Sequence, residues 1–297
     1  MFIRILLYLF MYSFLGWCAE VIYAALKEGE FVNRGFLNGP ICPIYGFGAV
    51  AVVVILRPFH DNLFILFAGS IVVTSLIELI TGFVLEKVFK HRWWDYSDEK
   101  FNIGGYICPI FSLMWGIACL VIVAYINPII VDVVNIIPET AAKIILTILM
   151  TLFTVDFIAT TETILKMNKR LERIEELTGL IRRASDDLGE NLAGGTIALM
   201  KRKEELEKEI DQKRSAVEEE LAEIKQAHME IMKNREQYLI NLKKAYNEIL
   251  EARFFGHKRI LKAFPGIKSS RHKDAMEKLR NHLLRSHRGE KINDKMK

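Results

Sequence analysis

The sequence has none of the short motifs that mark common catalytic and nucleotide-binding sites. It contains no Walker A sequence, no His-x-x-x-His metal pair and no Gly-x-Ser-x-Gly nucleophile elbow. Without a recognisable nucleophile and base, hydrolase chemistry has no visible basis. We therefore expect that the chain is not an enzyme and that it needs no cofactor and no metal.

Cysteines are also few. All four, Cys18, Cys42, Cys108 and Cys119, lie in the first 165 residues. Their spacing matches neither a disulfide framework nor a zinc ribbon. Cys42 and Cys108 each precede a proline, an arrangement that some proteins use to bind haem or a soft metal. Small buried cysteines are common, so burial is the favoured interpretation of both.

Charged residues are scarce in the same part of the chain. Residues 1–165 contain 9 Lys and Arg and 13 Asp and Glu, whereas the remainder contains 31 and 23. Long apolar runs without strand-like alternation predict an all-α membrane domain, followed by a water-exposed helical region. The N-terminal run has no small-residue cleavage site, which favours a retained helix. The five expected spans are residues 2–26, 41–57, 63–87, 105–127 and 140–165.

Lysines and arginines predict the orientation of these spans. An outside N-terminus puts most basic loop residues, including Lys27, Arg34 and Arg92, on the cytoplasmic side. Five spans then leave the charged C-terminal region in the cytoplasm. Residues 128–139 are apolar but end in Pro138-Glu139, so we expect them to lie at the membrane interface. The expected domains are residues 1–165, 166–251 and 252–297.

One stretch of the membrane domain occurs twice. The motif Gly-x-Ile-Cys-Pro-Ile at residues 39–44 returns 66 positions later, at residues 105–110. The same offset aligns Gly16 with Gly82 and Glu20 with Glu86. Seven of thirty positions are identical between residues 16–45 and 82–111. We interpret this as an internal duplication of a two-helix hairpin, with its copies related by a pseudo-twofold axis along the membrane normal.

Carboxylates inside the expected spans are the first candidates for function, because an ionised group in lipid is costly and normally faces protein or water. Glu78 and Asp156 lie about ten residues into their spans, roughly 15 Å deep. Glu20 is shallower, and Glu86 and Glu162 lie near the interface. For Glu78 and Asp156 the alternative is a structural hydrogen bond between helices. We expect Glu20, Glu78 and Asp156 to line a polar pathway.

The loops that lead into the repeated motif contain the remaining candidates. Prolines lack a backbone donor, so the helices that follow them cannot be regular throughout their first turn. One interpretation is that each exposed helix N-terminus binds an anion as part of a pathway. The other is that the proline simply starts the helix. The segment Trp93-Trp94-Asp95-Tyr96 suggests an aromatic belt at the membrane interface, with a cytoplasmic lid as the alternative. The candidates in these loops are Pro40, Pro43, Tyr45, Asp95, Asn102 and Pro109.

Helical periodicity continues beyond the last span. We expect a turn or flexible elbow at residues 189–195, which contain three glycines, and a long charged helix over residues 198–251. One heptad position of that helix is apolar and its partner is half polar, which indicates an imperfect coiled coil. It forms either an antiparallel hairpin or a homodimer between two chains.

The last 46 residues are strongly basic. Residues 252–297 contain 14 Lys and Arg against 4 Asp and Glu. Apolar residues interleave with these charges at helical spacing, which favours an amphipathic helix on an anionic lipid surface. No nucleic-acid-binding motif is present, so we do not expect a nucleic-acid partner.

Several motifs together resemble a known family. Gly35-Phe36-Leu37-Asn38-Gly39-Pro40, Pro43-Ile44-Tyr45-Gly46, Trp94-Asp95-Tyr96-Ser97, Asn102, Trp115-Gly116, Gly16-Trp17, Glu20, Glu78, Thr81-Gly82 and Glu86 are similar to the pattern of the bacterial putative ABC-transporter type IV family. The resemblance covers about residues 5–165.

This resemblance implies a transporter permease in the bacterial inner membrane. Because the chain has no ATP-binding motif, such a role requires a separate ATPase subunit in addition to the lipid bilayer. The alternative is a membrane-anchored scaffold or regulator, in which the C-terminal helices recruit a cytoplasmic partner and the carboxylates only hold helices together. The region after Lys166 is not explained by the family pattern.

Overall fold

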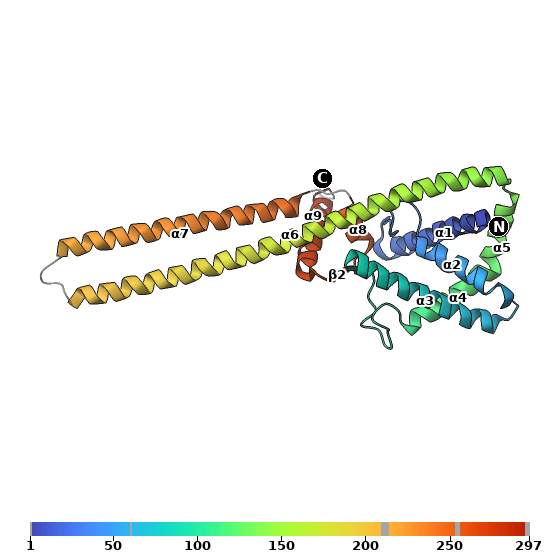
Figure 1. The fold of residues 1–297 in the computed structure, drawn as a ribbon, viewed down its shortest axis with the longest axis horizontal. Helices are drawn as coiled ribbons and strands as arrows, with labels where there is room; N and C mark the ends of the chain where they lie inside the picture. The colour runs from blue at the N-terminus through green and yellow to red at the C-terminus, as the bar shows by residue number, and fades with distance from the viewer. Residues whose placement is uncertain (1, 60, 209–213, 253–255, 295–297) are drawn as a thin grey trace. The chain divides into compact units, whose positions relative to one another are not determined.

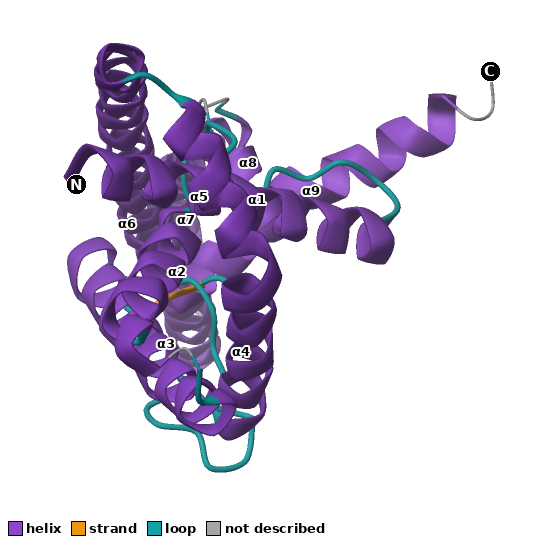
Figure 2. Cartoon of the chain, turned by 90° about the vertical axis from the view of Figure 1, so that its right-hand side faces the viewer, coloured by secondary structure: helices purple, strands orange, loops and turns teal. Residues whose placement is uncertain are grey.

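The computed structural model describes residues 2–59, 61–208, 214–252 and 256–294. These residues are helical apart from short loops and one two-residue antiparallel ladder. The chain divides into two compact units, residues 1–168 with 254–297 and residues 169–253. Figure 1 traces the elements in chain order, and Figure 2 shows the helices in purple. The all-α prediction is confirmed in this coarse form.

Unit 1 is built from paired helices. Helix α1 (Phe2–Glu28) packs on α2 (Pro43–Ile55), and α3 (Leu63–Phe89) packs on α4 (Pro109–Val121). Helices α2 and α3 also contact each other and join the two pairs. The short 3₁₀ helix η1 (Arg57–Phe59) connects them. This arrangement is compatible with the predicted duplication, which itself stays a prediction.

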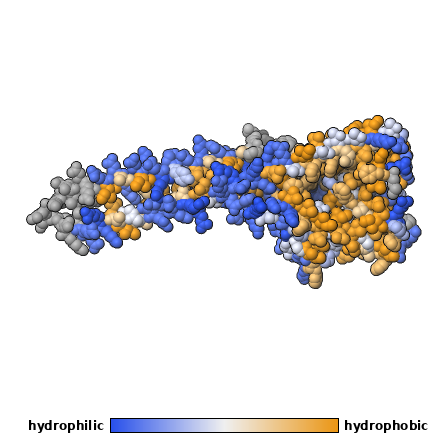
Figure 3. Space-filling model, in the orientation of Figure 1, coloured by the Kyte–Doolittle hydropathy of each residue, from blue (hydrophilic) through white to orange (hydrophobic). Residues whose placement is uncertain are grey.

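The apolar surface of unit 1 identifies it as a membrane unit. Four helices among the described residues are long and apolar enough to cross a bilayer: α1, α3, the path Pro109–Ile136 and the first part of α6 (Glu139–Lys208). Large side chains such as Leu63, Phe64 and Val88 are more than half exposed. Figure 3 shows this apolar face in orange. Since such a surface is stable only in lipid, membrane localisation is confirmed.

The expected second span is shorter than predicted. Helix α2 has 13 residues and therefore a length of about 20 Å, against roughly 30 Å for the hydrocarbon core of a bilayer. Cys42 precedes its first turn, and the chain leaves the helix at Leu56, just before Pro58. The number of five spans therefore stays a prediction.

The fourth apolar run does not end at Asn127-Pro128 as predicted. The chain continues through a π-helical turn, η2 (Ile122–Ile126), into α5 (Asn127–Ile136). A proline in a helix removes one backbone hydrogen bond and crowds the preceding turn, and the wider π-turn accommodates both effects. The path bends here in Figure 1.

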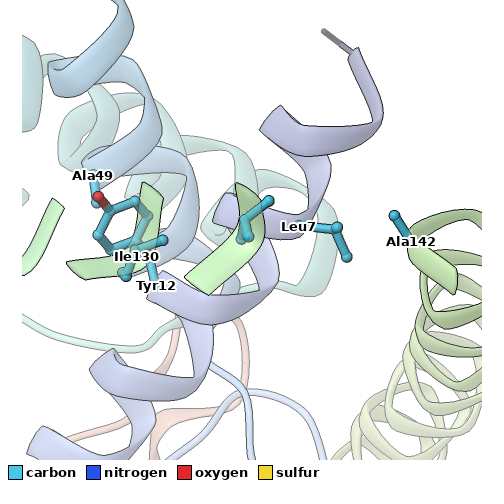
Figure 4. Packing of buried hydrophobic residues seen from close by; sticks show 6 residues of the cluster. Leu7, Tyr12, Ala49, Ile130 and Ala142 are labelled. Carbon is cyan, nitrogen blue, oxygen red and sulfur yellow. The ribbon is translucent and has the colours of Figure 1, made fainter. Parts of the chain in front are cut away.

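Helix α5 packs inward rather than forming a free interfacial segment. Its buried residues Ile130 and Val134 join Leu7, Tyr12, Ala49 and Ala142 in one apolar cluster (Figure 4). The Tyr12 hydroxyl donates to the Asn127 side chain at 2.8 Å. This cluster connects α5 with α1, α2 and the start of α6.

Unit 2 consists of the later part of α6 and helix α7 (Arg214–Glu251). The Arg170 guanidinium donates to the carbonyls of Ile249 and Leu250, and Arg235 donates to Asp187 at 3.1 Å. A Cβ at Gly195 would lie 2.2 Å from the His228 ring. From pair to pair the residue number on α6 rises while the residue number on α7 falls. The two helices therefore form an antiparallel hairpin within one chain. A homodimer through this region stays a prediction.

The predicted glycine elbow is wrong. Residues 189–195 are helical, and α6 continues to Lys208, whereas the antiparallel helix α7 begins at Arg214. Glycine weakens a helix but does not interrupt one that tertiary packing supports. At Gly195 the lack of a side chain allows the His228 ring to approach.

The C-terminal segment, residues 256–294, belongs to unit 1. It contains α8 (His257–Ala263), β2 (Lys268–Ser269) and α9 (Lys273–Asp294). Strand β2 pairs with β1 (His91–Arg92). Four apolar side chains of the predicted amphipathic pattern are buried in protein, whereas Phe264, Leu283 and Leu284 are partly exposed; the buried four are Ile260, Leu261, Met276 and Leu279. Binding of this segment to an anionic lipid surface stays a prediction.

Candidate functional site

Glu20 on α1 is the first carboxylate of the candidate site. The Tyr45 hydroxyl, from the first turn of α2, donates to one of its oxygens. The Arg34 guanidinium lies 3.0 Å from the other. Tyr45 reaches this position because Gly16 has no side chain: a Cβ there would lie 2.4 Å from the Cβ of Tyr45. Glu20 is therefore charge-compensated.

Glu78 on α3 is in a different situation. It is 8% exposed, and the Tyr96 hydroxyl donates to its Oε1 at 3.2 Å. Its Oε2 is buried and has no hydrogen-bond partner among the described residues. Tyr96 comes from the α3–α4 loop (residues 90–108) and stacks on Phe111 of α4, with ring centroids 4.7 Å apart.

Tyr96 connects the two carboxylates electrostatically. Burial first, and then the charge and hydrogen bond of Glu78, raise the pKa of Tyr96 well above its ordinary value. The charge of Glu20 acts on that pKa in the same direction. Glu20 pairs with Tyr45 and Glu78 pairs with Tyr96, and the two pairs are near enough for their charges to act on each other. We refer to these four residues as the carboxylate–tyrosine cluster.

Asp156 on α6 binds a loop instead. Its carboxylate accepts hydrogen bonds from the backbone N–H groups of Asn38 and Gly39 at 3.0 and 2.6 Å. The Asn38 amide and the Thr160 hydroxyl also donate to it. All four donors hold the carboxylate in place and tie the α1–α2 loop (residues 29–42) to α6. This geometry favours the structural interpretation of Asp156.

Two of the three candidate prolines, Pro43 and Pro109, are explained by the start of helices. Pro43 and Pro109 each occupy the first turn, after the N-cap residues Cys42 and Cys108. Proline is favoured there because its fixed φ suits the helix and its missing donor is not needed. Pro40 lies in the loop and is exposed. The helix starts thus fit the structural alternative for these residues.

Asp95 and Asn102 shape the α3–α4 loop. Asp95 accepts hydrogen bonds from Ser97, Arg92 and Lys268. Burial raises the pKa of Asp95, but these hydrogen bonds outweigh burial and hold that pKa well below its usual range. The Asn102 side chain accepts from Gly105 and donates to two carbonyls of the same loop. Gly104 and Gly105 adopt positive φ angles of 60° and 74°.

The aromatic-belt interpretation is wrong for Trp93. This side chain is 4% exposed and makes edge contacts with Phe264 of the C-terminal segment and with Phe36. The Trp94 ring N–H donates to the carbonyl of Tyr106. Both rings bind the loop to other parts of the protein.

The C-terminal segment contacts both loops. Arg259 donates to the carbonyls of Gly35, Phe36 and Leu37 at 3.0 to 3.1 Å. On the other loop, Lys268 contacts Asp95 at 2.6 Å. One segment therefore holds the chain ahead of α2 and the chain ahead of α4.

Glu86, the repeat partner of Glu20, takes part in the same contacts. It accepts from Arg92, Tyr106 and Ser270 at 2.7 to 2.9 Å. It thus joins the α3–α4 loop to the C-terminal segment rather than joining the carboxylate–tyrosine cluster.

Sequence reasoning did not predict the roles of Tyr96, Arg34 and Arg259. Tyr96 stood out only as one aromatic residue among several, and Arg34 counted only toward membrane orientation. Arg259 belongs to a basic, amphipathic stretch that resembles a lipid-binding helix. Since all its partners are backbone carbonyls more than 200 residues away, no local pattern could indicate them.

Comparison with known proteins identifies the membrane unit. A family model described as putative ABC-transporter type IV matches residues 7–161, more than half of the chain. The chain belongs to this family. The search of curated proteins found no match, and neither did the search of solved structures.

The family match covers only part of the structure. The putative ABC-transporter type IV region contains the whole carboxylate–tyrosine cluster and both loops. It ends within α6, shortly after Asp156. The hairpin of unit 2 and the C-terminal segment lie outside it. Arg259 and Lys268 therefore hold family loops through residues that the family model does not cover.

Proposed function

We propose that this chain is the membrane-spanning component of a transporter, with a polar pathway at the carboxylate–tyrosine cluster. Membership of the putative ABC-transporter type IV family supports the general class. The observation that carries the specific proposal is that two carboxylates on apolar helices, Glu20 and Glu78, each bond to a tyrosine, Tyr45 and Tyr96, whose charges act on each other. Polar groups at such a place usually serve a substrate or ion.

The proposed pathway is narrower than the sequence suggested. Its residues are Glu20, Tyr45, Glu78 and Tyr96, whereas Asp156, Asp95 and Asn102 shape the loops around it. The prolines set where α2 and α4 begin. In this proposal the N-terminus is outside and both loops face the cytoplasm, in the orientation that the basic residues favour.

A separate ATPase subunit completes the proposal. Energy from ATP would have to come from another polypeptide, because this sequence lacks a nucleotide-binding motif. The loops and the C-terminal segment offer surfaces on the expected cytoplasmic side for such a subunit.

A membrane-anchored scaffold is the second candidate. One observation favours it: both helices of the unit 2 hairpin carry apolar residues that are at least half exposed. These residues are Leu192, Ile197, Met200, Met229, Ile231 and Ile240. Exposed apolar residues on paired helices suit a helical partner, including a second copy of this chain.

Partner capture separates the two functions. We would purify the tagged full-length chain from its native membrane after cross-linking and measure ATP hydrolysis in the eluate. The matched variant removes residues 189–233 and joins the helices by a short flexible turn. This excision keeps the Arg170 contacts and the Asp187–Arg235 pair of the hairpin base.

A transporter component should co-purify with an ATP-hydrolysing protein in both forms. A scaffold should instead lose its partners when the hairpin is shortened. If neither form retains an ATPase, the transporter proposal fails.

A further inference from the structure

The carboxylates of the membrane unit differ in how their charge is compensated. Glu20 contacts Arg34 at 3.0 Å, and Glu86 contacts Arg92 at 2.9 Å. Glu162 contacts Lys166 at 2.7 Å. Asp156 has no cation at contact distance but accepts two backbone N–H bonds and two side-chain bonds. Each of these four carboxylates has partners that suit an ionised group.

Glu78 lacks such partners. Its single hydrogen bond comes from a neutral hydroxyl, that of Tyr96, and its Oε2 is buried without a partner among the described residues. Ser75, one turn earlier on the same helix, is neutral and bonds to Ser112 of α4. Tyr45 of α2 and Cys108, which precedes α4, are the further titratable groups around Tyr96, and Glu20 would only repel a second negative charge.

An ionised carboxylate in this position would be buried without compensation, which is strongly unfavourable in a low-dielectric environment. Binding of a proton removes the charge and leaves a neutral carboxylic acid. We infer that Glu78 is a proton-binding site that takes its proton from the water beyond the α3–α4 loop. The inference deepens the proposed transport function. It rests on that function only where it assigns the proton a role in transport.

Tyr96 is the positioning residue of this site. Its hydroxyl bonds to the carboxyl group, its ring stacks on Phe111, and its backbone N–H donates to Gly105 at 2.8 Å. The adjacent Asp95 is bound to Lys268 of the C-terminal segment. Tyr96 thus lies between Glu78 and the rest of the α3–α4 loop, so a change in that loop would change how a proton reaches Glu78.

Carbodiimide labelling tests whether the proton is present. Hydrophobic carbodiimides react with protonated carboxyl groups in apolar surroundings. We would treat the full-length chain in lipid nanodiscs with dicyclohexylcarbodiimide at several pH values and locate the adducts by peptide mass spectrometry. We expect modification at Glu78, at a rate that falls as pH rises, with Glu20, Glu86 and Asp156 unmodified in the same sample. Tyr96→Phe should change the rate of labelling at Glu78.

Thermal unfolding provides a second measurement that does not require the reagent to reach the site. A glutamate in an unfolded chain has a pKa of about 4.3. If the folded chain retains the proton at higher pH, the folded state binds more protons than the unfolded state, so stability falls as pH rises. The midpoint of the wild type should therefore fall relative to that of Glu78→Gln, which resembles the neutral acid, between pH 5 and pH 8.

The outcomes are distinct. A pH-independent difference between the two unfolding midpoints would overturn the inference, whatever the labelling result. So would a difference that depends on sodium or potassium concentration, because it would indicate a bound metal cation. Neither measurement uses a transported substrate or an ATPase subunit. Failure of the proton site and failure of the transporter proposal can therefore be told apart.

Discussion

Arg259 shows how a single side chain can organise a distant loop. Its guanidinium donates to three consecutive carbonyls of the α1–α2 loop, while Asp156 accepts from the next two N–H groups. Burial lowers the pKa of Arg259, and the nearby Asp156 opposes this effect. Residues 35–39 are thus held from both sides by groups of opposite charge.

We expect Arg259→Ala to loosen this loop. Hydrogen bonds to charged groups contribute roughly 1.5–3 kcal/mol each, and part of that is recovered when water replaces the guanidinium. A net loss of about 2 kcal/mol corresponds to roughly thirtyfold faster amide exchange. Hydrogen exchange of residues 35–41 measures it.

Lys262→Ala is the control for Arg259→Ala. Lys262 lies on the same helix and contacts Glu30 at 2.7 Å, but both side chains are about a third exposed. Exposed pairs contribute little. Equal exchange rates in the two variants would contradict the role assigned to Arg259.

His91 makes the attachment of the C-terminal segment sensitive to pH. It is fully buried and belongs to strand β1, where it pairs with Ser269 of the C-terminal segment. Burial lowers its pKa to about 4, and His272 acts in the same direction. An unfolded histidine has a pKa of about 6.5. As pH falls through this range the unfolded state gains protons first, so the stability that His91 contributes is complete above pH 6.5 and decreases below it.

Relative to His91→Asn, the wild type should lose roughly 2 kcal/mol of the unfolding free energy of unit 1 between pH 7.5 and pH 5, a contribution opposite in sign to that of Glu78. His91→Asn should remove much of this dependence, whereas His282→Asn on α9 should leave it unchanged. Denaturation midpoints across the pH series would measure it. Parallel pH profiles for the wild type and His91→Asn would refute the assignment.

At the scale of elements, helix α6 shows why composition alone misplaced a turn. Gly189, Gly194 and Gly195 lie within one helix that continues to Lys208. At Gly194 an added Cβ would meet nothing within 4 Å, whereas at Gly195 it would clash with His228. The partner helix therefore decides what each glycine does.

This contrast gives a matched pair of variants. Gly194→Ala should slow amide exchange around residues 190–200, since alanine stabilises a helix by about 1 kcal/mol relative to glycine. Gly195→Ala gains the same propensity but must displace the His228 ring, so its net effect should be smaller or destabilising. Equal stabilisation by both variants would argue against the antiparallel register.

At the scale of the whole molecule, the C-terminal segment is part of the membrane unit although it follows the hairpin in sequence. It buries Ile260, Leu261, Ile267 and Leu279 completely. Truncation after residue 253 would expose the surfaces that these residues cover. A truncation phenotype would therefore report on unit 1 as well as on the missing segment.

We expect removal of residues 254–297 to lower the unfolding temperature of unit 1 by several degrees, because loss of buried apolar contacts costs stability. Excision of residues 189–233 should leave that temperature unchanged. Heating followed by size-exclusion chromatography in detergent would compare the two. A truncated chain as stable as the wild type would show that the segment is not integral to the unit.

The sequence by itself determined the membrane unit, its helical class and the presence of carboxylates in apolar helices. These properties follow from local composition: an apolar run of sufficient length must form a helix in lipid, whatever its neighbours are. Its motifs also indicated the family correctly.

Only the tertiary structure decided which carboxylate is uncompensated. Glu20 and Glu78 are both carboxylates in apolar helices, yet Arg34 reaches one, while among the described residues Tyr96 alone bonds to the other. It also decided that the basic segment packs on protein and that the chain reverses beyond the glycines. These outcomes depend on partners distant in sequence, because the charge and burial of a side chain are set by what lies beside it in space.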